Sequence, residues 1–418
     1  MASAVGVART HLVGGASSPF GSAAPSILVA LGYAGALVVW LVGGDALPGG
    51  RPFAVHLFTL GVLTNLVLTF SEHFTRTLTR TPGERAWWWP LVTNVAILAV
   101  LTGLVVRWLP LLAGGATLLI AVVLLAYRRL RRMRRAAVGA RFGWIVRLYE
   151  RAHGAFLHGA VLGAAMGIGL VSGSWFSATR IAHLHANLLG WGGLTLLATL
   201  VFFGPTMART RIEPGAVVVA ARSLKHGATA LSAAVVLLFL AGVGGTWGAA
   251  LHVVAAAALA IFATTATAVC LPIVRALRAA PATAARPLVL GVCWWAIAVV
   301  WADVVIVTGQ AWRWLDALGV AALTGVLAQA ILATLVYLAP MLRGRTTVAR
   351  DAIRARLDRG ATGRAVALSA GALLSVLGAT RLAGPLPLLG VGWTVLTATA
   401  LTTALVAMWP VPEGPTST

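Results

Sequence analysis

Long apolar runs, separated by short polar connections, follow one another along the whole 418-residue chain. Each run holds about 18 or more residues, which as a helix would cross the roughly 30 Å hydrocarbon core of a bilayer. The pattern therefore predicts an all-α, polytopic integral membrane protein of about twelve transmembrane helices. The predicted spans are 26–44, 53–73, 89–107, 109–127, 150–173, 180–204, 224–242, 246–270, 286–309, 316–340, 364–383 and 387–409.

These runs also define the domain organisation. Residues 1–25 lack the short apolar region of a signal peptide, so we expect an N-terminal tail. Residues 26–410 form one membrane domain, with 26–204 and 224–410 as candidate halves, and residues 411–418 form a C-terminal tail. Between the third and fourth spans, Trp108-Leu109-Pro110 is predicted to be a tight turn because proline disrupts a helix interior.

Composition excludes several classes of protein. Hydrophobic residues make up 59% of the chain and charged residues only 10%, whereas soluble domains carry about 25% charged residues. The net charge of +22 does not indicate nucleic-acid binding, because the arginines lie between apolar runs and not on one face of a soluble domain. The two cysteines lie inside apolar runs and define no disulfide framework or thiolate metal site.

The arginines alternate between the two sides of the membrane. Segment 128–151 holds nine arginines, segment 343–364 holds seven, and three further arginine-bearing connections fall on the same side if there are twelve spans. The opposite connections carry one arginine or none. The positive-inside rule then predicts a plasma-membrane protein of a bacterium with both termini in the cytoplasm.

Two pairs of spans share short sequence motifs. Leu197–Val201 and Leu332–Val336 are the identical sequence LATLV, and each is followed by an aromatic residue and then a proline. We interpret this as a relation between the sixth and tenth spans. A weaker echo pairs His56 and Leu60-Gly61 of the second span with His185 and Leu189-Gly190 of the sixth.

Histidines inside the spans are the first candidates for function, because ionisable residues are costly there. A rise of 1.5 Å per residue places His56, His183 and His185 at one depth, near the outer ends of the second and sixth spans. Successive helical residues turn by about 100°, so His183 and His185 point to opposite sides of their helix. They suit two separate sites better than one metal ion, and Asn187 and Gly190 share the face of His183.

A bis-histidine haem takes one imidazole from each of two helices. His56 meets this requirement together with either His183 or His185, because all three share one depth. The alternative interpretation is that these histidines form hydrogen bonds across a helix interface.

Other polar residues are secondary candidates. His153 and His73 lie at membrane edges and His158 lies deeper, while Asp303 is a carboxylate inside the ninth span that could relay protons or pair with a histidine or with Arg313. Arg180 lies just outside the histidine layer, where it could bind the propionates of a haem or the lipid headgroups.

Two common motifs are missing from the chain. There is no phosphate-binding loop of the GxxxxGK[ST] type, which argues against an ATP-driven pump. There is also no HExxH sequence, which argues against the commonest intramembrane metalloproteases.

The stretch Ile181–Gly192, IAHLHANLLGWG, with Pro205 downstream, resembles the HxH helix of the haem–copper oxidase and nitric oxide reductase superfamily, and most of all that of the C-type oxidases. This resemblance implies that His183 and His185 ligate two different haems, and that His56 and His185 share the low-spin haem. Residues 56–74 resemble the membrane part of actinobacterial copper oxidases, which is sometimes joined to a multicopper, nitrite-reductase-like domain. Twelve-span NnrS proteins are more distantly similar.

The chain also departs from that superfamily. Its HxH motif lies on the sixth predicted span and not on the tenth, no two histidines are adjacent, and no tyrosine lies near the outer histidine layer. Full oxygen reduction is therefore not expected.

The leading hypothesis is a membrane redox protein that binds one or two haem b groups, with copper as a further candidate. It would transfer electrons between quinol and an outer-face partner, such as a multicopper or nitrite-reductase-like protein, or bind a small gas such as NO. A homo-oligomer is compatible with this reading. The alternatives are a transporter or copper-handling permease with a histidine-lined pathway, and a cofactor-free membrane subunit that docks a partner.

Overall fold

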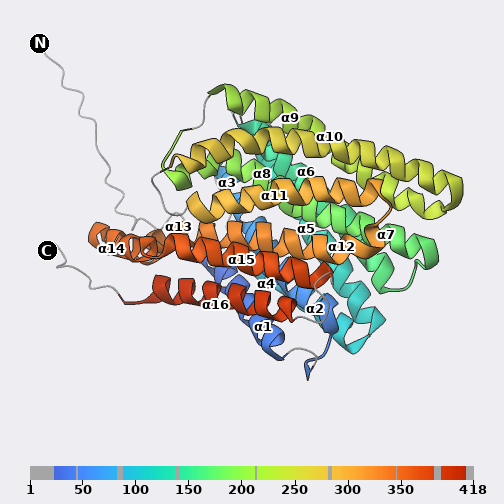
Figure 1. The fold of residues 1–418 in the computed structure, drawn as a ribbon, viewed down its shortest axis with the longest axis horizontal. Coiled ribbons are helices and arrows are strands. Elements are labelled where there is room, and N and C mark those ends of the chain that lie inside the picture. The colour runs from blue at the N-terminus through green and yellow to red at the C-terminus, as the bar shows by residue number, and fades with distance from the viewer. Residues whose placement is uncertain are drawn as a thin grey trace, which may run out of the picture.

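The computed structural model describes residues 23–43, 46–81, 88–137, 142–211, 214–280, 285–344, 346–380 and 387–410. Within these ranges it is almost wholly helical and contains no strand. Figure 1 shows most helices running along the long axis of the molecule, as expected for a bundle that crosses a bilayer. The predicted all-α membrane fold is confirmed, whereas both terminal tails lie largely outside the described residues.

The helices follow one another in three sets. The first is α1 (Ala24–Gly43), α2 (Gly50–His56), η2 (Leu57–Thr64), α3 (Asn65–Thr79), α4 (Trp89–Val106) and α5 (Leu109–Ala136). The second is α6 (Gly143–Gly167), α7 (Gly173–His185), η3 (Ala186–Gly193), α8 (Leu194–Ala208), α9 (Pro214–Leu240), the short η4 (Ala241–Val243) and α10 (Gly245–Arg278). The third is α11 (Ala285–Val307), α12 (Ala311–Val320), η5 (Ala321–Ala328), α13 (Gln329–Arg343), α14 (Thr347–Asp358), α15 (Ala361–Thr380) and α16 (Leu388–Met408).

Eleven helical stretches in the described residues are long and apolar enough to cross a membrane. The predicted fifth span, α6, is not among them, although it is 25 residues long. Its polar side chains lower its apolar character; they are Arg147, Glu150, Arg151, His153 and His158. The eleven stretches and α6 together occupy the twelve predicted positions.

The predicted turn between the third and fourth spans is confirmed. The α4 helix ends at Val106, and Arg107 adopts a left-handed conformation with φ of 53°. The next helix begins at Leu109 with Pro110 in its first turn, where the missing N–H of proline has no helical partner to lose. The short helix α14 was not predicted, and it lies within the arginine-rich segment 343–364.

Three of the long helices contain an eight-residue π-helical segment: η2, η3 and η5. Each segment continues without a break from an α-helix into another α-helix, so that α2–η2–α3, α7–η3–α8 and α12–η5–α13 are single long helices. Long π-helical segments are rare, and short ones are frequent at functional sites. The fifth residue of each segment is a glycine: Gly61, Gly190 and Gly325.

The three glycines make equivalent contacts. A Cβ atom would lie 2.4 Å from Tyr33 if built at Gly61, 2.5 Å from Ala155 at Gly190, and 2.5 Å from Trp294 at Gly325. The partners belong to α1, α6 and α11, which are the first helices of the three sets. The first helix of each set therefore packs closely against the π segment of that set, and only glycine leaves the space.

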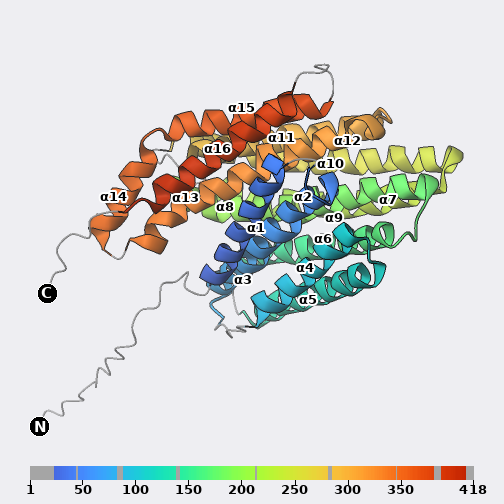
Figure 2. The ribbon, with the colours of Figure 1, turned by 90° about the horizontal axis from the view of Figure 1, so that it is seen from below.

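The remaining helices repeat the same plan. The hairpins α4–α5, α9–α10 and α15–α16 each pack as a pair, and Figures 1 and 2 place them at three different edges of the bundle. The π segments meet at its centre, where a Cβ at Gly192 would lie 3.3 Å from Leu327 and 3.6 Å from Leu63. The membrane domain is thus built from three four-span units, and the predicted boundary between residues 204 and 224 falls inside the second unit.

Side-chain contacts join the arginine-bearing helix ends at one face, which we call the arginine-rich face. Arg129 of α5 pairs with Glu72 of α3 at 3.0 Å, and Arg134 of α5 pairs with Glu150 of α6 at 2.6 Å. Arg343 of α13 donates a hydrogen bond to a carbonyl oxygen near the end of α16. The predicted gathering of these ends on one side is therefore present, while their exposure to the cytoplasm stays a prediction.

A histidine pair at the ends of two helices

His56 and His183 lie side by side near the face opposite to the arginine-rich face. Their ring centroids are 6.4 Å apart and their planes are tilted by 30°. Nδ1 of His56 lies 2.6 Å from the Pro52 carbonyl oxygen, and Nδ1 of His183 lies 2.7 Å from the Gly159 carbonyl oxygen. An Nδ1–H donated to a carbonyl fixes the tautomer and leaves the lone pair of Nε2 as a metal ligand.

The neighbouring helix α6 shapes the surroundings of His183. A Cβ at Gly163 would lie 2.7 Å from Cε1 of His183, and one at Gly159 would lie 2.3 Å from Nδ2 of Asn187. Asn187 donates a hydrogen bond to the His183 carbonyl oxygen at 2.8 Å, and its Nδ2 lies 3.3 Å from Nδ1 of the ring. The predicted location of Asn187 on the His183 face is confirmed, and the two glycines give both side chains their space.

The spacing of the two imidazoles fits a shared metal ion. A metal–imidazole bond is about 2.0–2.1 Å long, so two imidazoles that bind one metal ion from opposite sides have ring centres roughly 6 Å apart. The observed 6.4 Å agrees with this value. Both side chains are partly buried.

His185 occupies different surroundings from His183, as the opposite-face argument predicts. It is fully buried at 0% exposure, and its Nδ1 lies 2.8 Å from the carbonyl oxygen of Ile181. Its Nε2 is buried and has no hydrogen-bond partner among the described residues. The structure brings His56 together with His183, not with His185 as the resemblance implied. His56 and His183 lie side by side, but a shared level along the helices did not fix how the helix of His56 is rotated toward that of His183.

His153 is a second fully buried histidine of the same unit. Its Nδ1 lies 2.7 Å from the Tyr149 carbonyl oxygen, and its ring meets Trp191 edge-on with centroids 4.8 Å apart. Within the described residues, Nε2 of His153, Nε1 of Trp191 and Oγ1 of Thr195 are buried without a hydrogen-bond partner. Buried polar atoms usually have partners, so this group of buried atoms without hydrogen-bond partners is an unusual feature of the second unit.

The other secondary candidates contribute less. His158 is exposed and its Nδ1 lies 2.9 Å from the Gly154 carbonyl oxygen, while His73 packs against Phe74 toward the arginine-rich face. Oδ1 of Asp303 is buried without a hydrogen-bond partner in the described part of the chain. Arg313, its predicted partner, lies over the Trp314 ring at 4.9 Å.

Arg180 forms an ion pair with Asp316, a residue that the sequence analysis did not single out. Its guanidinium lies 2.5 Å from Asp316 of α12, and the two side chains are 48% and 60% exposed. This pair joins the outer ends of α7 and α12. No local signal links two residues 136 positions apart, and a role of Arg180 toward propionates or headgroups stays a prediction.

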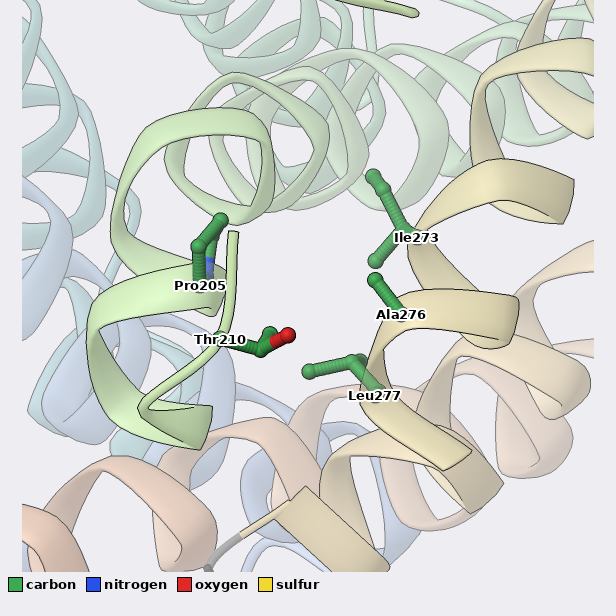
Figure 3. A pocket seen from close by; sticks show the side chains of 5 residues that line it. All are labelled: Pro205, Thr210, Ile273, Ala276 and Leu277. Carbon is green, nitrogen blue, oxygen red and sulfur yellow. The ribbon is translucent and has the colours of Figure 1, made fainter. Parts of the chain in front are cut away.

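No larger ligand set accompanies the histidine pair. In the residues that the structure describes, no group of three or more histidine, cysteine, aspartate or glutamate side chains could hold a metal ion. Figure 3 shows a pocket between the ends of α8 and α10 at the arginine-rich face. It is lined by Pro205, Thr210, Ile273, Ala276 and Leu277, which offer no titratable group.

A scan against protein-family models finds no match to this chain, and a search of the curated proteins finds no similar one. The resemblance to the haem–copper oxidase superfamily therefore stays a prediction that rests on the quoted motifs.

Proposed function

We propose that the protein is a haem-binding membrane redox protein in which His56 and His183 would hold the haem. The observation that carries this proposal is the pair of imidazoles from two different helices, 6.4 Å apart, with each Nδ1 facing a backbone carbonyl. Two imidazoles from facing helices are the ligand set of a bis-histidine haem b.

The protein's own groups would tune this site. The carbonyl oxygens of Pro52 and Gly159 accept the Nδ1–H bonds and hold each ring, which raises the basicity of Nε2. Haem, when bound, supplies one-electron chemistry. If both His56 and His183 held the haem, no position would be left for NO, and the site would favour electron transfer between quinol and an outer-face partner, such as a multicopper protein.

The test is the visible spectrum of detergent-purified protein. The wild type is expected to show a Soret band and, after reduction with dithionite, a sharp α band. Both His56→Ala and His183→Ala should lose the six-coordinate, low-spin spectrum, because one imidazole leaves the iron high-spin or releases the haem.

His252 provides a matched control. Its Nδ1 lies 3.0 Å from the Gly248 carbonyl oxygen, but no ring contact joins it to another histidine in the described residues. His252→Ala should keep the spectrum unchanged. A wild-type protein that is colourless after expression with added haem precursor would rule the proposal out.

A copper site is the second candidate function, and the same imidazole pair favours it. Two imidazoles with this separation of ring centres would also suit a single metal ion bound between them without a porphyrin, and imidazole is a good copper ligand. A copper-handling permease would then use this pair as a relay site. Metal analysis separates the two readings: one copper and no haem in wild type, with the copper lost in His183→Ala, would favour the permease.

A further inference from the structure

The α5 helix is longer than a membrane requires. Its 28 residues extend about 42 Å at 1.5 Å per residue, whereas the hydrocarbon core is about 30 Å thick. Trp108 precedes the helix at the outer end and Tyr127 lies 19 residues further along, about 28 Å away. Aromatic residues prefer the two interfaces, so Arg128 lies at the hydrocarbon boundary and the last two turns lie beyond it.

Six arginines of this segment divide into two groups. Arg129 and Arg134 turn toward the bundle, where Glu72 and Glu150 neutralise them. The other four are exposed and form no ion pair or side-chain hydrogen bond within the described part of the chain; they are Arg128, Arg131, Arg132 and Arg135. We call these four residues the arginine stripe.

The arginine stripe occupies one face of α5. Its members are spaced i, i+3, i+4 and i+7, which places them on the same side of a helix. The helix packs against α3, α4 and α6, and Figure 2 shows the α4–α5 hairpin at an edge of the bundle. Like charges at these spacings repel one another, so an anionic partner would stabilise the stripe.

We propose that the arginine stripe binds the phosphate headgroups of anionic phospholipids. Arg128, Arg131 and Arg132 lie within about 6 Å of the hydrocarbon boundary along the helix axis. The headgroup layer is roughly 5–8 Å deep on each side, so phosphate groups are the anions found at this depth. A guanidinium matches phosphate with two parallel hydrogen bonds. This inference does not rest on the histidine pair.

The test compares two variants with the same loss of charge. One is R128Q/R131Q/R132Q/R135Q, and the other, R209Q/R222Q/R275Q/R278Q, removes four exposed arginines from the ends of α8, α9 and α10. Native mass spectrometry of detergent-solubilised protein would titrate phosphatidylglycerol against phosphatidylcholine. Each basic residue near the membrane contributes a factor of about five in affinity, so the stripe variant should bind phosphatidylglycerol at least about tenfold more weakly.

The control variant should lose clearly less affinity than the stripe variant, because its arginines are divided among three helices and do not line one face. Equal losses in both variants would show that the affinity depends on net charge and not on the arginine stripe, and would overturn the proposal. A wild type with no preference for phosphatidylglycerol would overturn it as well. Displacement of the lipid by millimolar inorganic phosphate would show a site for free phosphate instead. If the quadruple variant does not fold, as judged by circular dichroism, R128Q/R131Q should still lower the affinity measurably.

Discussion

The helices α7–η3–α8 and α12–η5–α13 have the same backbone and different chemistry. Both carry a π segment at the same place, both place a glycine against the first helix of their unit, and both continue into the sequence LATLV. An offset of 135 residues aligns them throughout, so that Gly190 corresponds to Gly325. At that offset, Leu318 and Val320 stand where the second unit has His183 and His185.

This difference separates the architecture from the function. The third unit builds the same π segment without any histidine, so the imidazoles are not required for the packing of the helix. Burying an imidazole without a partner costs free energy, and His185 leaves its Nε2 in that state. The packing of the helix therefore does not account for the histidines of the second unit.

The largest expected effect comes from placing residues of the third unit in the second. His183→Leu should abolish the low-spin haem spectrum completely, because it removes one of the paired imidazoles. His185→Val should retain that spectrum, since His185 does not face His56. Absorption spectra of the reduced proteins, at equal concentration, measure both effects.

The opposite result would favour the pairing of His56 with His185 that the sequence resemblance implies. The apparent unfolding temperature serves as the control. Leucine and valine occupy the equivalent positions of the third unit, so both variants should remain folded in detergent and give a single peak in size-exclusion chromatography.

A smaller effect is expected from the ion pair that joins the first unit to the second. Glu150 of α6 accepts two hydrogen bonds from Arg134, at 2.6 and 3.1 Å, and is buried. Glu150→Gln should lower the free energy of unfolding by about 2–3 kcal/mol, less than for a fully buried pair because Arg134 is partly exposed. Asp316→Asn, in the exposed pair with Arg180, should cost below about 1 kcal/mol.

The apparent unfolding temperatures of the two variants in one detergent measure this difference. A shift for Asp316→Asn as large as that for Glu150→Gln would show that solvent exposure does not determine how much each ion pair stabilises the protein.

The glycines of the π segments test whether the three units are equivalent. Gly190→Ala and Gly325→Ala should each lower the free energy of unfolding by about 1–3 kcal/mol, because the added Cβ overlaps a neighbouring helix. Gly154→Ala in α6 is the control, since nothing lies within 4 Å of a Cβ there, and it should be neutral or stabilise by up to about 1 kcal/mol.

The neighbour of Gly190 offers a rescue experiment. A Cβ at Gly190 would meet the Cβ of Ala155, so adding Ala155→Gly to Gly190→Ala should recover most of the lost stability. Absence of recovery would mean that the π segment needs glycine for its backbone and not for this contact.

The sequence predicted the spans well because the bilayer imposes a minimum length on every apolar run. The predicted third span, 89–107, and the α4 helix, Trp89–Val106, agree almost residue for residue. Helix α14 was missed because its 12 residues are too short and too rich in arginine to register as a span. Its signal was present in Ala349, Ile353 and Leu357, which are spaced four apart and are buried.

The candidate site was predictable in depth but not in pairing. Counting residues placed His56 and His183 at one level, and the helical step separated His183 from His185. Each π segment has more residues per turn than an α-helix, so it changes the direction in which the side chains beyond it point. The apolar character of these segments does not reveal that change. The repeated glycine, noted at Gly61 and Gly190, was the one trace of them.

The smallest effect concerns a polar position that differs among the three units. Asn65, Leu194 and Gln329 follow the three π segments at equivalent places. Nε2 of Gln329 donates a hydrogen bond to Ser369 at 3.2 Å, but its Oε1 is buried without a partner in the described residues. Gln329→Leu loses a bond that contributes about 1 kcal/mol and removes an unsatisfied atom that costs about as much, so the unfolding free energy should change by less than about 1 kcal/mol.

Asn65→Leu is the informative contrast. Asn65 exchanges two hydrogen bonds of 3.0 Å with Asn94 and donates a third to the Gly61 carbonyl oxygen at 2.8 Å. Leucine at this position would remove the hydrogen bonds that Asn65 makes with Asn94 and with the Gly61 carbonyl oxygen, which lowers the unfolding free energy by about 1–3 kcal/mol. Thermal unfolding of both variants decides whether the polar residue stabilises this position in both units that have one or, as expected, only in the first. A loss above about 2 kcal/mol for Gln329→Leu would contradict that expectation, and would mean that Oε1 has a partner, such as a buried water.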